Sequence, residues 1–133
     1  MCVIVAKYFP GIGWAGAKNR DRKYIPELDF IESEENGVDR MMMHDLITGY
    51  KEGINSHGIS ILNTSLDVES DEPDVDEGKA AASPDGKIIA AALLQDSVED
   101  AVKLLLKYKL VGCTIVFDQQ KLYLIEAADQ DGT

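Results

Sequence analysis

Cys2, directly after Met1, is the residue of this 133-residue chain that is best suited to nucleophilic chemistry. Removal of the methionine, which a small second residue permits, gives Cys2 a free α-amine beside its thiol. An α-amine has an ordinary pKa of about 8, so it can take the thiol proton at neutral pH without a separate histidine. The sequence thus indicates either a cysteine nucleophile with its own base or a cysteine that packs as a small hydrophobic residue at the start of a strand.

A group of charged residues follows in the segment "AKNRDRKY". Asp21 is suited to hold or orient the amine of Cys2, and Arg20 or Lys18 is suited to lower the pKa of the thiol. The alternative for such a run is a solvated, charged turn.

A second polar group lies in "GINSHGISILN". Asn55 is typical of a tight turn, and we expect His57 in that turn to be exposed. Asn63 follows on the outgoing strand, where an amide can donate to the oxyanion of a tetrahedral intermediate. We expect Cys113, in an alternating strand further on, to belong to the core.

The element that positions Cys2 is predicted from the apolar residues 2–9. They are apolar on both faces, which is typical of a strand buried between two layers. The turn residues "PGIG" at 10–13 and a returning strand at 14–19 predict a hairpin. This hairpin would bring Lys18 and Arg20 back beside Cys2.

The rest of the chain predicts antiparallel sheets covered by helices, the α+β class. Residues 25–36 are irregular and acidic and predict no element. The predicted elements are a short strand at 38–43, a hairpin at 46–66 with its turn at 55–58 and with Ile59, Ile61 and Asn63 on one face, helices at 87–94 and after a Ser97 cap, and a hairpin at 112–127. We expect one domain over residues 1–133, with a solvated acidic loop at 67–79 that is the most mobile part of the chain.

Composition excludes several classes of partner. The chain has 24 acidic and 13 basic residues, a net charge of −11, so we expect no nucleic-acid partner. No apolar run approaches the roughly 20 residues that span a bilayer, and no secretory signal is present, so we expect a cytoplasmic protein without a membrane partner. The two cysteines have only His44 and His57 to join them, at no metal-binding spacing, so we expect no metal and no other cofactor.

These motifs together resemble the choloylglycine hydrolase and penicillin V acylase family of N-terminal-nucleophile (Ntn) hydrolases. The opening "MC" resembles the catalytic cysteine of the family, and "AKNRD" is similar to its Gly-Arg-Asn-x-Asp segment. "NRDR" is also similar to the Asn-Arg-Asp-Glu motif of a related Ntn-like family. "GINSHG" with Asn63 resembles the turn and oxyanion asparagine, and "SVEDAVKLLLKYKLV" and "TIVFDQQKLYLIEA" resemble the helix and the hairpin behind it. The resemblance runs from Cys2 to about Glu126.

The resemblance implies a fold of αββα layers, of which this chain supplies the N-terminal part. It also implies a cysteine amidohydrolase that cleaves a linear, non-peptide carbon–nitrogen amide bond through an acyl-enzyme. Cys2 would be the nucleophile and general base, Asp21 would position the amine, and Asn63 would supply an oxyanion donor. Lys18 stands where the family usually has arginine, with Arg20 as a possible substitute, and Ser65 is an alternative to Asn63.

Two other functions remain open from the sequence. An acyltransferase would use the same Cys2 and differ only in the acceptor, and a non-catalytic Ntn-like protein would serve assembly. For either enzyme we expect a small-molecule amide substrate. The chain stops before the Asn-Ser/Thr-Pro segment and distal arginine of the family. A sheet face stays apolar at Val3, Val5, Ile115 and Ile125, so we expect a homo-oligomer or a further C-terminal segment to cover it.

Overall fold

The computed structural model describes residues 2–20, 25–64, 84–108, 110 and 112–127. The predicted acidic loop at 67–79 lies outside these residues. The strands and helices are β1 (Val3–Phe9), β2 (Gly13–Asn19), β3 (Leu28–Glu35), β4 (Val38–Asp45), β5 (Lys51–Asn55), β6 (Ser60–Thr64), α2 (Pro84–Ala92), α3 (Val98–Tyr108), β7 (Gly112–Phe117) and β8 (Leu122–Ala127). The prediction of an α+β protein with antiparallel sheets is confirmed.

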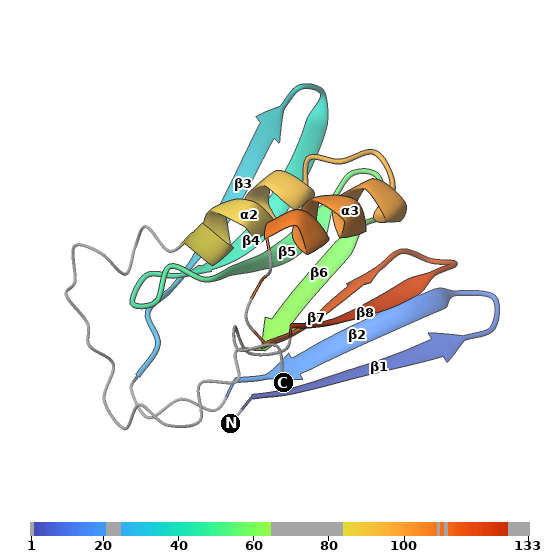
Figure 1. Ribbon diagram of the computed structural model, residues 1–133, viewed down its shortest axis with the longest axis horizontal. Coiled ribbons are helices and arrows are strands. Elements are labelled where there is room, and N and C mark those ends of the chain that lie inside the picture. Colours follow the sequence, from blue (N-terminus) through green and yellow to red (C-terminus); the bar gives the residue numbers. More distant parts are fainter. Residues whose placement is uncertain (1, 21–24, 65–83, 109, 111, 128–133) are drawn as a thin grey trace.

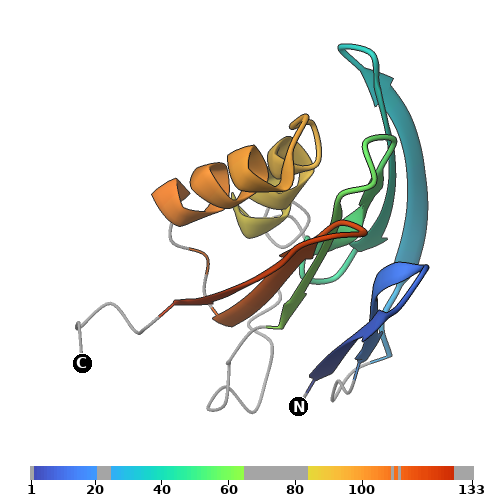
Figure 2. The ribbon, with the colours of Figure 1, turned by 90° about the vertical axis from the view of Figure 1, so that its right-hand side faces the viewer.

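The described elements form three layers. Strands β3 to β8 pair in sequence order as one six-stranded antiparallel sheet, and β1 pairs only with β2. Helices α2 and α3 cover one face of the large sheet, and the β1–β2 hairpin lies on its other side (Figures 1 and 2). The apolar core fills the space between helices and sheet, with Met42, Ile59, Ile61, Ile89, Ala92, Leu93, Val98, Ala101, Leu105, Leu110 and Val116 buried there.

The β1–β2 hairpin approaches the large sheet closely at its turn end. The main-chain nitrogen of Trp14 donates to the carbonyl oxygen of Gln119 at 3.3 Å. A Cβ atom built on Gly16 would lie 2.8 Å from the ring of Phe117 and 3.2 Å from Leu62. An isolated two-stranded sheet is at best marginally stable in water, so this contact with the large sheet is what stabilises the hairpin.

The outer face of the hairpin is exposed. Val3 and Val5 are 52% and 60% exposed, and no described element covers them. The prediction that this strand is buried on both faces is therefore wrong: the outer face has no covering layer, and on the inner face of β1 Ile4 alone is partly buried. Ile115 is buried on the hairpin side of the sheet, opposite Leu62, and Ile125 packs against the core under the helices.

Strand β3 is the one element that the sequence pattern did not predict. Residues 25–36 predicted no element, yet 28–35 pair with β4 along their whole length. The backbone hydrogen bonds to β4 select the strand conformation here, since neither face of β3 is continuously apolar. The other predicted hairpins and both helices are confirmed, and the Ser97 hydroxyl caps α3 by accepting from the nitrogen of Asp100 at 3.1 Å. No helix in the described part of the chain is long and apolar enough to cross a membrane.

Replacement of Gly16 by valine tests the close approach of the two sheets. We expect Gly16→Val to lower the free energy of unfolding by about 1–3 kcal/mol, because the new side chain overlaps Phe117 and Leu62. The matched control is Ala17→Val on the exposed face of the same strand, with an expected change within about 0.5 kcal/mol. Urea unfolding measures both, and equal midpoints for the two variants would contradict the close contact.

Candidate functional site

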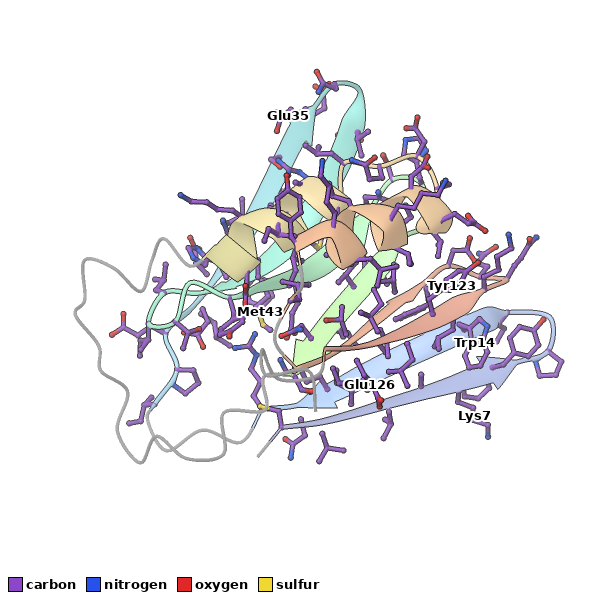
Figure 3. All side chains as sticks on the ribbon, viewed as in Figure 1. Lys7, Trp14, Glu35, Met43, Tyr123 and Glu126 are labelled. Atoms are coloured by element: carbon purple, nitrogen blue, oxygen red, sulfur yellow. The ribbon has the colours of Figure 1, made fainter. Side chains whose placement is uncertain are left out.

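Cys2 lies directly before β1, on the face of the hairpin that is turned toward the large sheet. The register pairs Val3 with Asn19 and Ile4 with Lys18, whose side chain contacts the large sheet. Side chains alternate along a strand, so Cys2, Ile4 and Lys18 share the inner face. Cys2 is half-buried there. Figure 3 shows Lys7 and Trp14 near the hairpin turn, at the opposite end of the strands from Cys2.

Two cations from the hairpin meet two carboxylates from the large sheet. The ammonium of Lys18 donates to the carboxylate of Glu52 and to the main-chain oxygen of Asn63. Arg20 Nη1 donates to Asp45 Oδ2 at 3.0 Å, and Arg20 Nη2 lies 3.5 Å from Glu52 Oε1. All four charged side chains are buried or nearly so. We call Lys18, Arg20, Asp45 and Glu52 the interlayer ion cluster; their formal charges cancel.

The pKa of Lys18 links this cluster to Cys2. Burial lowers the pKa of the Lys18 ammonium below its ordinary value, and the carboxylate of Glu52 opposes that effect. Arg20 lowers it further, whereas the negative charge of a Cys2 thiolate raises it. Lys18 and Cys2 therefore lie within electrostatic reach of each other.

Asn63 faces the other way from the site that the family resemblance implies. Its side chain shares a face with Ile61, which packs under the helices, and Asn63 Nδ2 donates to Thr114 Oγ1 at 2.6 Å. The structure thus brings the main-chain oxygen of Asn63 to the hairpin side and leaves its amide on the helix side. Asp21 and the alternative donor Ser65 lie outside the described residues.

Asn55 is a turn residue, as its spacing predicts. Its Oδ1 accepts from the main-chain nitrogens of His57 and Ile59, each at 3.0 Å, and its Nδ2 donates to the carbonyl of Leu93 at 2.9 Å. The exposed His57 lies 3.3 Å from Asp96. These contacts fasten the β5–β6 turn to the end of α2 and leave no catalytic role for either residue.

Asp45 and Glu52 were not predicted from the sequence as site residues. Asp45 also accepts from the main-chain nitrogens of Ile47 and Thr48, so it fixes the β4–β5 connection as well as Arg20. Glu52 is buried on the next strand, β5. Their local sequence gives no clear signal, because Asp45 lies between His44 and Leu46 and Glu52 lies between Lys51 and Gly53.

A separate pocket of about 490 Å³ lies on β3, β4 and β5. Its lining combines the carboxylates of Glu32, Glu34 and Asp39 with the apolar side chains of Met41 and Ile54. No cysteine, lysine or histidine is among its lining residues. The pocket therefore offers no nucleophile comparable with Cys2.

The chain matched no protein-family model, no curated protein and no solved structure. The chemistry of the candidate site therefore has to be inferred from its own residues. The arrangement provides a half-buried thiol directly before a strand, a lysine within electrostatic reach of it, and a carboxylate, Glu52, that pairs with the lysine.

Removal of Glu52 tests the interlayer ion cluster. We expect Glu52→Ala to lower the free energy of unfolding by about 3–5 kcal/mol, because Lys18 loses its carboxylate partner while it stays buried. The control is Glu35→Ala, which breaks the ion pair with Arg40 at a carboxylate that is 55% exposed; we expect a change of about 0–1 kcal/mol there. Comparable losses in urea unfolding of the two variants would show that the cluster is not a buried network.

The lowered pKa of Lys18 predicts the sign of a pH effect. Between the folded pKa and 10.5, the unfolded chain binds the Lys18 proton more tightly than the folded chain, so the contribution of Lys18 to stability rises with pH. We expect the unfolding free energy of the wild type, relative to that of Lys18→Met, to rise up to pH 10.5 and then to level off. Urea unfolding at stepped pH measures it, and a difference that falls with pH would refute the shift.

Proposed function

We propose that this chain is a cysteine Ntn amidohydrolase of the cytoplasm, similar to choloylglycine hydrolases and penicillin V acylases, that cleaves a linear, non-peptide amide. The observation that carries the proposal is the position of Cys2, directly before β1 and within electrostatic reach of Lys18. The two antiparallel sheets, with helices on one outer face, agree with the α, β and β layers of an αββα fold. Both cysteines are free thiols, as a reducing compartment would leave them.

In the proposed reaction, loss of Met1 frees the α-amine of Cys2. The amine takes the thiol proton, and the sulfur attacks the amide carbonyl to form a tetrahedral intermediate. When the carbon–nitrogen bond breaks, the ammonium returns the proton to the leaving amine, and a thioester remains on Cys2. Water then attacks the thioester with the amine again as base, which releases a carboxylic acid and restores the thiol. An acyltransferase would differ only by the use of an amine in place of water.

We assign the stabilisation of the oxyanion to Lys18 and nearby main-chain N–H groups. The Lys18 ammonium lies within electrostatic reach of Cys2, and a fixed charge with little solvent around it stabilises a developing oxyanion strongly. Glu52 and the main-chain oxygen of Asn63 hold that ammonium, so both are positioning groups. The amide of Asn63 takes no part, since it is bonded to Thr114 on the helix side. The role of Asp21 as the residue that orients the amine stays a prediction.

A non-catalytic assembly protein is the second candidate. The exposed outer face of the hairpin, with Val3, Val5 and Phe9, favours it because monomers rarely leave apolar strand faces open. We propose that a second copy of the chain or a further C-terminal segment covers this face. In the enzyme, the same contact would complete the αββα layers.

Paired cysteine variants test the enzyme proposal. We expect Cys2→Ser to lower turnover of linear amides by about a thousandfold or more. The control, Cys113→Ser, should keep full activity, because burial first and the charge of Glu126 second raise the pKa of the Cys113 thiol and leave it unreactive. A panel of N-acyl p-nitroanilides measures turnover, and intact mass shows loss of Met1 and the acyl group on Cys2. Activity in protein that retains Met1, or equal activity in both variants, would contradict the mechanism.

A further inference from the structure

The first strand of the large sheet has an open edge. Strand β3 pairs with β4 on one side, and no other described strand lies along its second side. With eight residues, Leu28–Glu35, it is longer than the usual strand of about five or six. An edge strand presents main-chain N–H and carbonyl groups to which another extended chain can bond. Strand β3 therefore offers a template for one further strand.

An apolar groove lies beside this edge, on the sheet face that is turned away from the helices. Met41 of β4 and Ile54 of β5 are register partners in its floor, and they are 48% and 47% exposed. The residue after Met41, Met42, is buried in the core under the helices, so Met41 points to the opposite face. The β1–β2 hairpin lies on that face too, but it does not reach the turn between β3 and β4 (Figures 1 and 2).

Three carboxylates surround this apolar floor. Glu32 is the register partner of Met41, and Glu34 is the partner of Asp39, so the three acids share the face of Met41 and Ile54. All three are exposed and line the pocket of about 490 Å³. None of them forms an ion pair with another described residue. We call Glu32, Glu34, Asp39, Met41 and Ile54 the acidic groove.

The acidic groove keeps its negative charge because the neighbouring cation is engaged elsewhere. Arg40 is the basic residue among the described lining residues. Its Nη1 donates to the main-chain oxygen of Ala90 at 2.7 Å, and its Nη2 donates to Glu35 at 3.1 Å. Ala90 belongs to α2, so the guanidinium is turned to the helix side of the sheet. The groove therefore complements a cation with an apolar part.

Charge also excludes several other occupants of the acidic groove. A second copy of the chain, with a net charge of −11, would bring further acids to it, and a nucleic acid or an anionic membrane would be repelled. The segments 65–83 and 128–133 contain seven and two acids and a single lysine. Arg22 and Lys23 precede the Leu28 end of β3, whereas the groove lies toward the other end. The complementary occupant is a basic segment of another protein.

We infer that an extended basic segment of another protein binds along β3 as a seventh strand of the large sheet. Every second side chain of such a strand faces the acidic groove. The residues of β3 on this face are Phe30, Glu32 and Glu34 in order, and Phe30 is 69% exposed. The partner thus carries a large apolar side chain opposite Phe30 and lysine or arginine two and four residues from it. This docking site does not rest on the proposed amidohydrolase.

Two peptides of equal composition test the pattern. The probe is TKTKTFT, blocked at both ends and labelled with a fluorophore; its lysines and its phenylalanine share one face in a strand. In the control, TKKTTFT, only one lysine shares the face of the phenylalanine. Fluorescence anisotropy with the full chain measures the Kd, and NMR of ¹⁵N-labelled protein reports whether the β3 amides shift. We expect the probe to bind about threefold more tightly than the control, because it forms one more ion pair.

N-methylation separates strand pairing from attraction between charges. Along an extended strand, successive residues turn their N–H groups to opposite sides, so only one alternate set can donate to β3. Two further versions of the probe carry N-methyl groups, one at the odd residues and one at the even residues. We expect one version to bind as the probe does and the other to bind about tenfold more weakly, because it loses several main-chain hydrogen bonds.

Paired variants test the carboxylates. Glu32→Gln combined with Glu34→Gln should weaken binding of the probe about fivefold, because two ion pairs are lost. The control combines Asp100→Asn with Glu126→Gln and removes two exposed carboxylates from α3 and β8, so the two variants have the same net charge. The control should bind the probe as the wild type does. Thermal unfolding checks that both variants are folded.

Each contrary outcome identifies a different occupant or none. Equal losses in the two paired variants would show that binding follows net charge alone, and would overturn the docking site. Equal binding of the two N-methylated versions would overturn strand pairing. Displacement of the probe by phenethylamine at equal concentration would assign the groove to a small organic cation instead. No saturable shift of the β3 amides with up to about 1 mM probe would overturn the inference as a whole.

Discussion

The position of the β1–β2 hairpin depends on the pairing of charges that neither sheet can bury alone. The buried cations, Lys18 and Arg20, come from the end of the hairpin. The buried carboxylates come from β4 (Asp45) and β5 (Glu52). The desolvation cost of burying each carboxylate is offset by a cation from the other layer. The apolar contact of Gly16 with Phe117 and Leu62 anchors the turn end, and the interlayer ion cluster anchors the Cys2 end. The end of the hairpin that carries Cys2 is therefore held to the large sheet by ion pairs.

In the proposed enzyme, this arrangement would position the catalytic group directly before a strand. The hairpin has no flanking strand in the described part of the chain, so its geometry is set by the large sheet beneath it. Cys2 directly precedes the backbone ladder that fixes Lys18. In the proposed enzyme, the α-amine and Lys18 would approach the thiol without any long connecting segment, which is the pre-organisation that nucleophilic catalysis requires.

Most of the strands and both helices could be predicted because their sequences have clear periodicity. The features that were not predicted have physical causes. Strand β3 escaped because its acids interrupt both faces and pairing to β4 decides its conformation. For Asn63, alternation predicted correctly that it shares a face with Ile59 and Ile61. Alternation does not show which layer this face packs against. In the structure it packs against the helices. Glu52 was not predicted because its partner, Lys18, lies 34 positions away in the chain, and a local pattern carries no information about so distant a contact.

The uncovered hairpin also affects the tendency of the protein to aggregate. Among the described residues, β1 and β2 each have one ladder partner, so each offers an open edge, and the outer valines lie beside it. Such edges join to one another readily unless charge keeps molecules apart. The net charge of −11 provides that repulsion near neutrality, but it vanishes toward the isoelectric point of about 4.5. Acidification toward this point thus removes the barrier to strand-by-strand growth, so an acid precipitation step would favour aggregates.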